Sequence, residues 1–156
     1  LELDRAGTRD EINRQIGSMV ERQLLTEEEA KAADIEMIYG FLDSETGRRI
    51  RSAVNVRREV PFNYRKKACE VMKDWASNDD TLLIQGVIDC FFEEEGQWVL
   101  VDYKTDYVDS EEKVTQTADR YRIQIDLYTE ALEQITGKPV KERILCLLSI
   151  NRAVKM

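Results

Sequence analysis

GVIDCFFEEEGQWVLVDYKT, residues 86–105, is the stretch of the chain that decides its fold. Two runs rich in β-branched and aromatic residues flank a short polar segment, 94–97, that contains a glycine. Such runs around a glycine-containing turn are typical of a β-hairpin. The sequence therefore predicts two neighbouring antiparallel strands, with Asp89 on the first and Asp102 and Lys104 on the second.

The two aspartates lie at equal distances from the centre of the predicted turn, so we expect them to be roughly cross-strand partners. Two like charges directly opposite each other destabilise a sheet. A divalent cation between the carboxylates would remove that conflict, since hard oxygen ligands bind Mg²⁺ or Mn²⁺. Lys104 follows Asp102 by two residues and shares its face of the strand. The intervening Tyr103 points to the other face, but its backbone carbonyl can still reach the metal.

This set of groups predicts phosphodiester hydrolysis. A bound metal polarises a phosphoryl oxygen and lowers the pKa of a bound water, while Lys104 would position that water or stabilise charge in the transition state. Gly86 would let a backbone or a substrate approach closely. The alternative is a surface hairpin with an ordinary Asp–Lys pair, because each motif alone occurs often by chance.

The rest of the chain predicts helices before the hairpin and one long helix after it. Thr8–Glu11 and Thr26–Glu29 have the capping-box spacing, and an apolar stripe follows each. Before the hairpin we expect a helix from Thr8 to Leu24 and a helix from Thr26 to Leu42, in a unit that Gly47 ends. A strand from Ala53 to Phe62, with Pro61 near its end or on an edge, an ambiguous helix from Lys66 to Ala76 and a turn at Ser77–Asp80 should follow. After the hairpin we expect a helix that starts between Ser110 and Thr117 and stops near Gly137, and then a strand from Arg143 to Ile150.

This order predicts an α/β (α+β) fold in which helices flank a central mixed sheet. A length of 156 residues suits one domain, 1–156. No apolar run approaches the roughly 20 residues of a membrane helix, and the first residues are too polar for a signal peptide. The chain starts without methionine, so we expect a piece of a longer protein. Three separated cysteines without a CxxC pair argue against zinc or iron–sulfur binding and suit the reducing cytoplasm.

The formal net charge of −8 argues against nucleic acid, but the cations are unevenly distributed. Residues 48–67 hold eight cations against the single acid Glu59, and a second cationic stretch runs from Lys138 to Lys155. A local basic surface can hold phosphates even on an acidic domain. The alternative is an ordinary solvated face. The eight cations are Arg48, Arg49, Arg51, Arg57, Arg58, Arg65, Lys66 and Lys67.

The long helix contributes a second set of candidates. Gln124 and Tyr128 are four residues apart and share a helix face, so we expect both to reach the site and contact the scissile strand or its attacking water. The alternative for Tyr128 is core packing. The apolar stripe of this helix consists of Tyr121, Ile125, Tyr128, Leu132 and Ile135.

Four segments of the chain together resemble the RecB-family nucleases of the PD-(D/E)xK superfamily, and among them the C-terminal nuclease domains of AddA-type helicase–nucleases. The segments are Glu59–Phe62, Gln85–Asp89, Leu100–Asp106 and Tyr121–Tyr128. The resemblance implies a restriction-endonuclease-like core, with Asp89 and Asp102 as metal ligands and Lys104 as the catalytic lysine. It also implies that Gln124 and Tyr128 form the QxxxY motif, and it leaves the role of Glu59 open.

The same resemblance implies a Mg²⁺-dependent DNA exonuclease, in which Mn²⁺ can substitute, acting in double-strand break repair and recombination. The substrate would be single-stranded DNA fed by helicase domains upstream in the same chain, and an AddB-like protein would be the partner. The family's helical histidine ligand has no counterpart, since the chain contains no His. We expect it just before Leu1, with Glu11 as a conceivable substitute.

Two other functions stay open at this point. The missing histidine favours a catalytically incomplete nuclease fold that binds DNA or a protein partner. The other function, a free-standing phosphohydrolase of small molecules, would use the same metal chemistry, but such a substrate needs no extended basic stretch like 48–67. ATP use by this chain is not expected, because Gly137-Lys138 lacks the other residues of a phosphate-binding loop.

Overall fold

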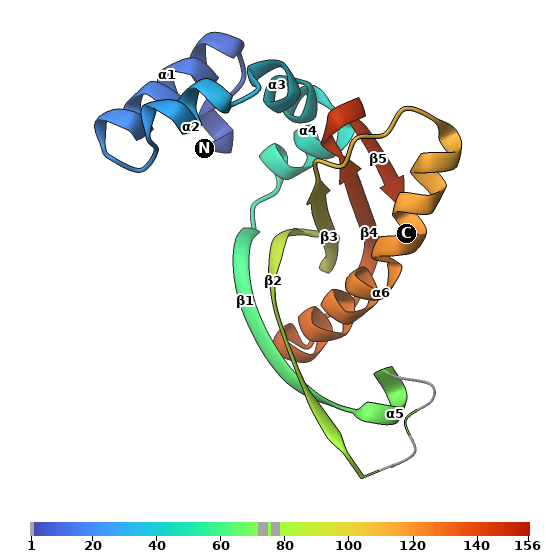
Figure 1. The fold of residues 1–156 in the computed structure, drawn as a ribbon. Helices are drawn as coiled ribbons and strands as arrows, with labels where there is room; N and C mark the ends of the chain where they lie inside the picture. The colour runs from blue at the N-terminus through green and yellow to red at the C-terminus, as the bar shows by residue number, and fades with distance from the viewer. Residues whose placement is uncertain (1, 72–74, 76–78) are drawn as a thin grey trace.

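The computed structural model describes residues 2–71, 75 and 79–156, and its centre is a five-stranded mixed sheet in the order β1-β2-β3-β4-β5 (Figure 1). Strands β3 and β4 are parallel, and the other neighbours are antiparallel. The predicted α+β class with a mixed sheet is therefore confirmed. The elements are η1 (Leu3–Arg5), α1 (Arg9–Glu21), α2 (Glu27–Ala32), α3 (Ile35–Asp43), α4 (Glu45–Ser52), β1 (Val56–Lys67), α5 (Ala68–Val71), β2 (Thr81–Glu94), β3 (Gln97–Lys104), α6 (Glu111–Thr136), β4 (Val140–Leu147), η2 (Leu148–Ile150) and β5 (Arg152–Lys155).

The hairpin of β2 and β3 is the predicted one. Its turn consists of Glu95 and Gly96, whose φ angles are 55° and 78°. Positive φ at both central residues is typical of the two-residue turn whose twist matches that of antiparallel strands. The pairing runs from Glu94–Gln97 to Cys90–Val101. Asp89 and Asp102 follow directly after the last pair of this ladder, so they lie at the same end of it without being paired themselves.

Local signals also set the bounds of α6. The Ser110 side chain accepts a hydrogen bond from the Lys113 N–H at the start, and Gly137 ends the helix with φ 67°. A left-handed residue directly after a helix is usually glycine, because it lacks the Cβ that penalises this conformation. Ile125 and Leu132 are buried as expected, whereas Ile135 is 56% exposed, so the predicted apolar stripe ends one turn early.

The second predicted helix is wrong in its extent. Both expected capping boxes are present, but Ala33 is extended and Asp34 starts a new helix by accepting a hydrogen bond from the Met37 N–H. Ser44 caps α4 in the same way. Gly47 lies inside α4 and does not end the unit. A Cβ on Gly47 would lie 2.2 Å from the Phe41 carbonyl oxygen, so glycine is needed for the close approach of α3 and α4.

Two strands also differ from expectation. Strand β1 starts at Val56 and continues to Lys67, with Pro61 on the sheet edge, where its missing N–H costs no ladder bond. The expected helix from Lys66 to Ala76 starts too early, because Lys66 and Lys67 still belong to β1, and α5 covers Ala68–Val71. Residues 72–74 and 76 of that helix, and 77–78 of the turn after it, lie outside the described residues. Strand β4 runs from Val140 to Leu147, and the short, largely exposed β5 was not predicted, since four residues show too little alternation.

Helices cover both faces of the sheet (Figure 1). Helix α6 packs on one face, and α3 and α4 pack on the other. Cys90 and Cys146 belong to the second core, where burial raises the pKa of their thiols to about 11 and about 12. No helix in the described part of the chain is long and apolar enough to cross a membrane. The largest fully buried side chains next to α6 are Ile88, Leu100, Ile125, Leu132, Leu145 and Leu147.

Candidate active site

Asp89 lies where β2 separates from β3. Pairing of these strands ends at Cys90–Val101, and beyond it β2 pairs only with β1. At this fork the Asp89 Oδ2 atom accepts a hydrogen bond of 2.9 Å from the Tyr103 N–H. The carboxylate therefore ends the ladder by binding the first backbone N–H that lacks a strand partner.

The backbone opposite Asp89 is irregular as well. Glu59 lies across from it in the β1–β2 register, between the pairs Arg58–Cys90 and Val60–Ile88, and has a left-handed φ of 52°. Residues two apart on a strand normally lie on the same face of the sheet. Ile88 and Cys90 do not, because Ile88 belongs to the core beside α6 whereas Cys90 belongs to the core on the other face. A strained residue next to a candidate site is consistent with a local functional constraint.

Asp102 and Lys104 lie on the face of β3 that α6 covers. Asp102 is 1% exposed, and its Oδ2 atom lies 2.5 Å from the ammonium of Lys104, whose side chain is 14% exposed. The two side chains thus form a buried ion pair at hydrogen-bonding distance. Burial raises the pKa of Asp102, Lys104 opposes the increase, and the nearby charge of Asp89 adds to it. A second cation would relieve this conflict.

Helix α6 brings both of its predicted residues to Asp102. The Gln124 amide Nε2 donates to the Tyr128 hydroxyl at 2.8 Å and to Asp102 Oδ1 at 3.4 Å. The Tyr128 ring also packs edge-on against Phe62, with 5.3 Å between ring centroids. A Cβ on Gly86 would lie 2.8 Å from the Phe62 ring, so this glycine admits the two rings. Tyr128 is therefore both a packing residue and a polar contact of the site.

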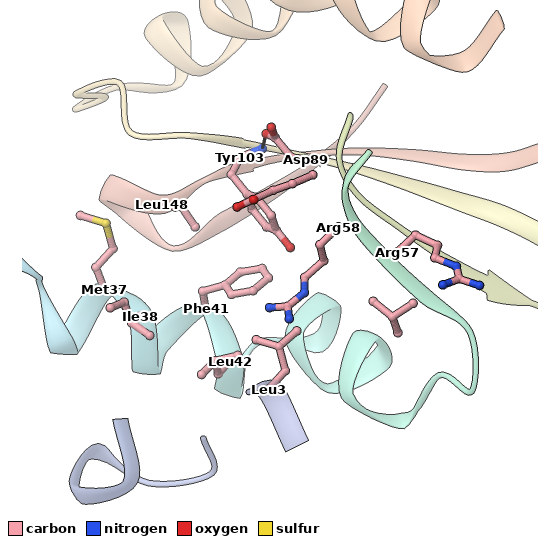
Figure 2. Close-up of a pocket in the computed structure, with 12 residues that line it drawn as sticks. Leu3, Met37, Ile38, Phe41, Leu42, Arg57, Arg58, Asp89, Tyr103 and Leu148 are labelled. Carbon is pink, nitrogen blue, oxygen red and sulfur yellow. Dashed lines mark hydrogen bonds between the residues drawn. The ribbon is translucent and has the colours of Figure 1, made fainter. Parts of the chain in front are cut away.

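A cavity of about 880 Å³ opens beside Asp89 on the face away from α6 (Figure 2). The Tyr103 ring forms one wall, as predicted for that face, and lies edge-on to Phe41 at 5.1 Å. Arg58 reaches into the space between these rings and α3, whereas Arg57 points away from it (Figure 2). The lining residues are Leu3, Met37, Ile38, Phe41, Leu42, Val56, Arg57, Arg58, Glu59, Asp89, Tyr103 and Leu148.

The structure thus places the predicted site residues in two connected groups. Asp89 and Tyr103 line the cavity, whereas Asp102, Lys104 and the α6 residues lie behind them, between β3 and α6. The two groups meet at the Asp89–Asp102 pair, which is close enough for their charges to interact. Glu59 lines the cavity too, on the edge strand.

The carboxylate pair fits a hard divalent cation in part. Asp102 offers a buried carboxylate whose Oδ2 atom is ion-paired with Lys104, and Asp89 supplies a second carboxylate. Mg²⁺ commonly uses one or two carboxylates and keeps several waters. Among the described residues, no group of three or more His, Cys, Asp or Glu side chains could hold a metal. Glu11 is no substitute for the third ligand, because its carboxylate binds the Thr8 N–H and hydroxyl and it does not line the cavity.

Many cations of the two basic stretches are engaged in ion pairs. Each cation of the second stretch, Lys138–Lys155, is paired with an acid. In the first stretch, ion pairs engage Arg48, Arg49 and Lys66. Most of these pairs join segments distant in sequence, so the sequence could not reveal them. Arg65 and Lys67 are exposed and have no ion pair among the described residues.

Two residues next to the site had no predicted role. The ring of Tyr121 lies 4.4 Å from the Lys104 ammonium, and its hydroxyl donates to Asp106 at 3.0 Å. Tyr121 was assigned to the apolar stripe of α6, and Asp106 follows the second strand of the hairpin. Helical spacing puts Tyr121 one turn before Gln124, which is the available sequence signal.

Comparisons with known proteins agree on the family. A family model described as the PD-(D/E)XK nuclease superfamily matches residues 3–154. An ATP-dependent helicase/nuclease subunit of Thermoanaerobacter sp. (strain X514) is 48% identical over 149 residues, which is 94% of this chain and 12% of that protein. The protein of the same name from Clostridium botulinum (strain 657 / Type Ba4) is 42% identical over 159 residues, or 100% of this chain and 12% of that protein.

The chain thus spans only about an eighth of these curated relatives, and the same holds for their namesake in Alkaliphilus oremlandii (strain OhILAs), of which it covers 13% at 42% identity. Among solved structures, the crystal structure of SSO0001 aligns with 99% of this chain and 63% of its own at 13% identity and a TM-score of 0.48, too distant to carry an argument. The match over residues 3–154 and the two aspartates and lysine on the central hairpin lead to the same conclusion. The chain belongs to the PD-(D/E)XK nuclease superfamily.

Proposed function

We propose that this chain is the divalent-metal-dependent nuclease domain of a larger helicase–nuclease and hydrolyses phosphodiester bonds of DNA as an exonuclease. The observation that carries the proposal is the buried Asp102 carboxylate, which lies 2.5 Å from the Lys104 ammonium and close enough to Asp89 for the two charges to interact. Two interacting carboxylates and a lysine in such a position are costly to a fold unless they serve a site.

Each residue of the site has a defined role in this proposal. Asp89 and Asp102 would hold Mg²⁺, with Mn²⁺ as a substitute and the Tyr103 carbonyl as a further oxygen donor. When bound, the ion supplies Lewis-acid activation of the phosphate and of a water. The Lys104 ammonium, shielded from solvent, donates to the attacking water or to a phosphoryl oxygen. Gln124 holds the Asp102 carboxylate and the Tyr128 hydroxyl in place. In the proposed complex, Gln124 and Tyr128 contact the scissile strand.

The names of the relatives support the wider setting. They are helicase/nuclease proteins, and this chain matches a small part of each. We therefore assign the domain to a longer chain whose helicase domains feed single-stranded DNA to the nuclease, with an AddB-like protein as partner. The setting would be double-strand break repair and recombination in the cytoplasm.

The outer face of the β1–β2 extension is the route that we propose for the DNA strand. From Val60–Ile88 to Lys67–Thr81 these strands pair only with each other, and they extend away from β3 (Figure 1). Phe62 and Tyr64 pack toward α6, so Arg65 lies on the opposite face by strand alternation, as does Lys67. Together with Arg58 in the cavity, these cations form a path for phosphates that ends at Asp89.

Removing Arg65 and Lys67, the two cations on this outer face, should weaken DNA binding and reduce its dependence on salt. In the double variant Arg65→Gln/Lys67→Gln, we expect the slope of log affinity against log salt to fall by about 1.4, since each phosphate contact to a single strand contributes about 0.7. Fluorescence anisotropy with a labelled single strand at several salt concentrations measures this slope. The matched control is Arg152→Gln/Lys155→Gln, which removes the same charge from cations that are already ion-paired and should leave the slope unchanged. Equal slopes for both double variants would exclude this route.

A second candidate function is a nuclease fold that binds DNA or a partner without cleaving it. The observation that favours it is the absence, among described residues, of a third side chain that could complete a metal site. Calorimetry with Mn²⁺ separates the two functions. Binding of the ion by the full-length protein, lost in an Asp89→Ala variant, supports the nuclease. No binding favours the fold that binds DNA or a partner without cleaving it.

The direct test of the proposed function is cleavage of DNA. We expect the full-length protein to degrade an end-labelled single strand with Mg²⁺, and a chelator to stop the reaction completely. A small phosphodiester such as bis(p-nitrophenyl) phosphate serves as the comparison. Cleavage that continues in the chelator, or that prefers the small ester to DNA, would contradict the proposal.

A further inference from the structure

The Lys104 ammonium has two contacts of different kinds. One is the Asp102 carboxylate at 2.5 Å, and the other is the face of the Tyr121 ring, whose centroid lies 4.4 Å from Nζ. A lysine side chain has a long flexible stem, so a single charged neighbour does not define where the ammonium lies. An ammonium within about 6 Å of a ring centroid is attracted by the negative ring face, more strongly when solvent is excluded. The ring therefore supplies the second point that defines the ammonium position.

The Tyr121 ring is itself held in place. Its hydroxyl donates to Asp106 Oδ2 at 3.0 Å. The Arg120 guanidinium, which is paired with Asp106, also lies 4.8 Å from the ring centroid. Burial would raise the pKa of Asp106, but the hydrogen bonds from Tyr121 and Arg120 lower it overall, which keeps the acceptor ionised. A charged acceptor makes the stronger hydrogen bond.

Asp106 is anchored from a third segment. The Ser149 hydroxyl, in η2 after β4, donates to the Asp106 backbone carbonyl at 2.6 Å. The chain of contacts thus runs from η2 through the loop after β3 to α6, and from there to the ammonium. Simple core packing would explain the buried edge of the Tyr121 ring, but it does not require the hydroxyl contact or the stacking of two cations on the ring.

We propose that Tyr121 is a positioning residue that holds the Lys104 ammonium through its ring face, and that Asp106 fixes the ring. The inference rests on the proposed function, in which Lys104 acts on the phosphate or the water. The ring holds the ammonium close to Asp102 without a second carboxylate that would bind the ammonium and compete with the substrate. Tyr121 itself touches neither substrate nor reacting atoms.

The kinetic test separates the ring from the hydroxyl. We expect Tyr121→Leu to lower kcat for DNA cleavage by about 10- to 100-fold with little change in KM, because a misplaced catalytic group costs rate and not binding. Tyr121→Phe keeps the ring face but loses the hydrogen bond to Asp106, so kcat should fall by only about threefold. Tyr107→Leu is the matched control, since its exposed ring also lies near a lysine, Lys113 at 5.7 Å, but not near Lys104, and kcat should not change.

A second measurement does not depend on activity. In NMR spectra, the Cε protons of Lys104 should show an upfield ring-current shift that persists in Tyr121→Phe and disappears in Tyr121→Leu, with the signal assigned by Lys104→Arg. Loss of kcat and of the shift together in the leucine variant supports the proposal. Equal losses in the phenylalanine and leucine variants, or an unshifted Lys104 signal in the wild type, would overturn it. A wild type that shows the shift but does not cleave DNA refutes the proposed function and leaves the ring–lysine contact standing.

Discussion

Asp102→Asn is expected to lower the rate of DNA cleavage by at least about 10³-fold, since it removes a charged group at the reacting centre. The carboxylate is buried, interacts with Asp89 and lies against Lys104, so the change removes a metal ligand and the partner of the lysine at once. A gel assay with labelled single-stranded DNA and Mg²⁺ measures the rate. Asp119→Asn is the matched control, because that carboxylate belongs to an exposed pair with Arg122 and its loss should not affect cleavage.

The same substitution also tests whether Asp102 is only structural. Removing one partner of a buried ion pair costs about 3–5 kcal/mol, because the other charge is left uncompensated. Asp102→Asn/Lys104→Met removes both charges, so its free energy of unfolding in urea should return toward the wild-type value while cleavage remains absent. Cleavage that recovers along with stability in the double variant would show that Asp102 acts through the fold alone.

Gly47→Ala is expected to lower the free energy of unfolding by about 3 kcal/mol or more, at the upper end for an overpacked site. Its Cβ would lie 2.2 Å from the Phe41 carbonyl oxygen and 2.7 Å from the Leu42 Cα atom. These are backbone atoms, which cannot rotate away as a side chain can. Helices α3 and α4 would have to separate, and this movement would displace Phe41, which lines the cavity beside Asp89. Urea unfolding followed by circular dichroism measures the loss.

Gly17→Ala provides the control for the glycine prediction. Gly17 lies inside α1, and a Cβ on it would meet no atom within 4 Å. Alanine costs less backbone entropy than glycine in a helix, so this variant should be more stable by about 0.5–1 kcal/mol. Equal effects at both positions would show that helix propensity, and not the close approach of α3 and α4, determines the need for Gly47.

The sequence was most informative where neighbours along the chain make the contact. The capping boxes at Thr8 and Thr26, the Ser110 cap and the left-handed Gly137 were readable because each involves residues within about one helical turn. The same kind of signal at Asp34 and Ser44 divides the predicted helix Thr26–Leu42 into α2 and α3 and starts α4 after it. The hydrophobic stripe outweighed the caps in that prediction.

Contacts between distant segments were beyond the sequence. The five cations of the last stretch look like a basic surface until their acidic partners on other elements are placed beside them. Likewise, the break in alternation at Asp89 depends on which core each strand face meets, and period-two reasoning alone does not reveal it. The Tyr121–Lys104 contact is of the same kind, since it joins α6 to β3.

The hairpin combines both kinds of information. Its two-residue turn sets the register of β2 and β3, because antiparallel pairing is symmetric about the turn, and so the sequence alone brings Asp89 and Asp102 to the same end of the ladder. The tertiary structure decided the environment of those residues. Strand β2 separates from β3 at Asp89, and α6 covers Asp102 and Lys104. Burial is set by what packs on a strand and not by the strand itself. The carboxylate pair was therefore predictable, whereas its desolvation, which makes the pair costly without a cation, was not.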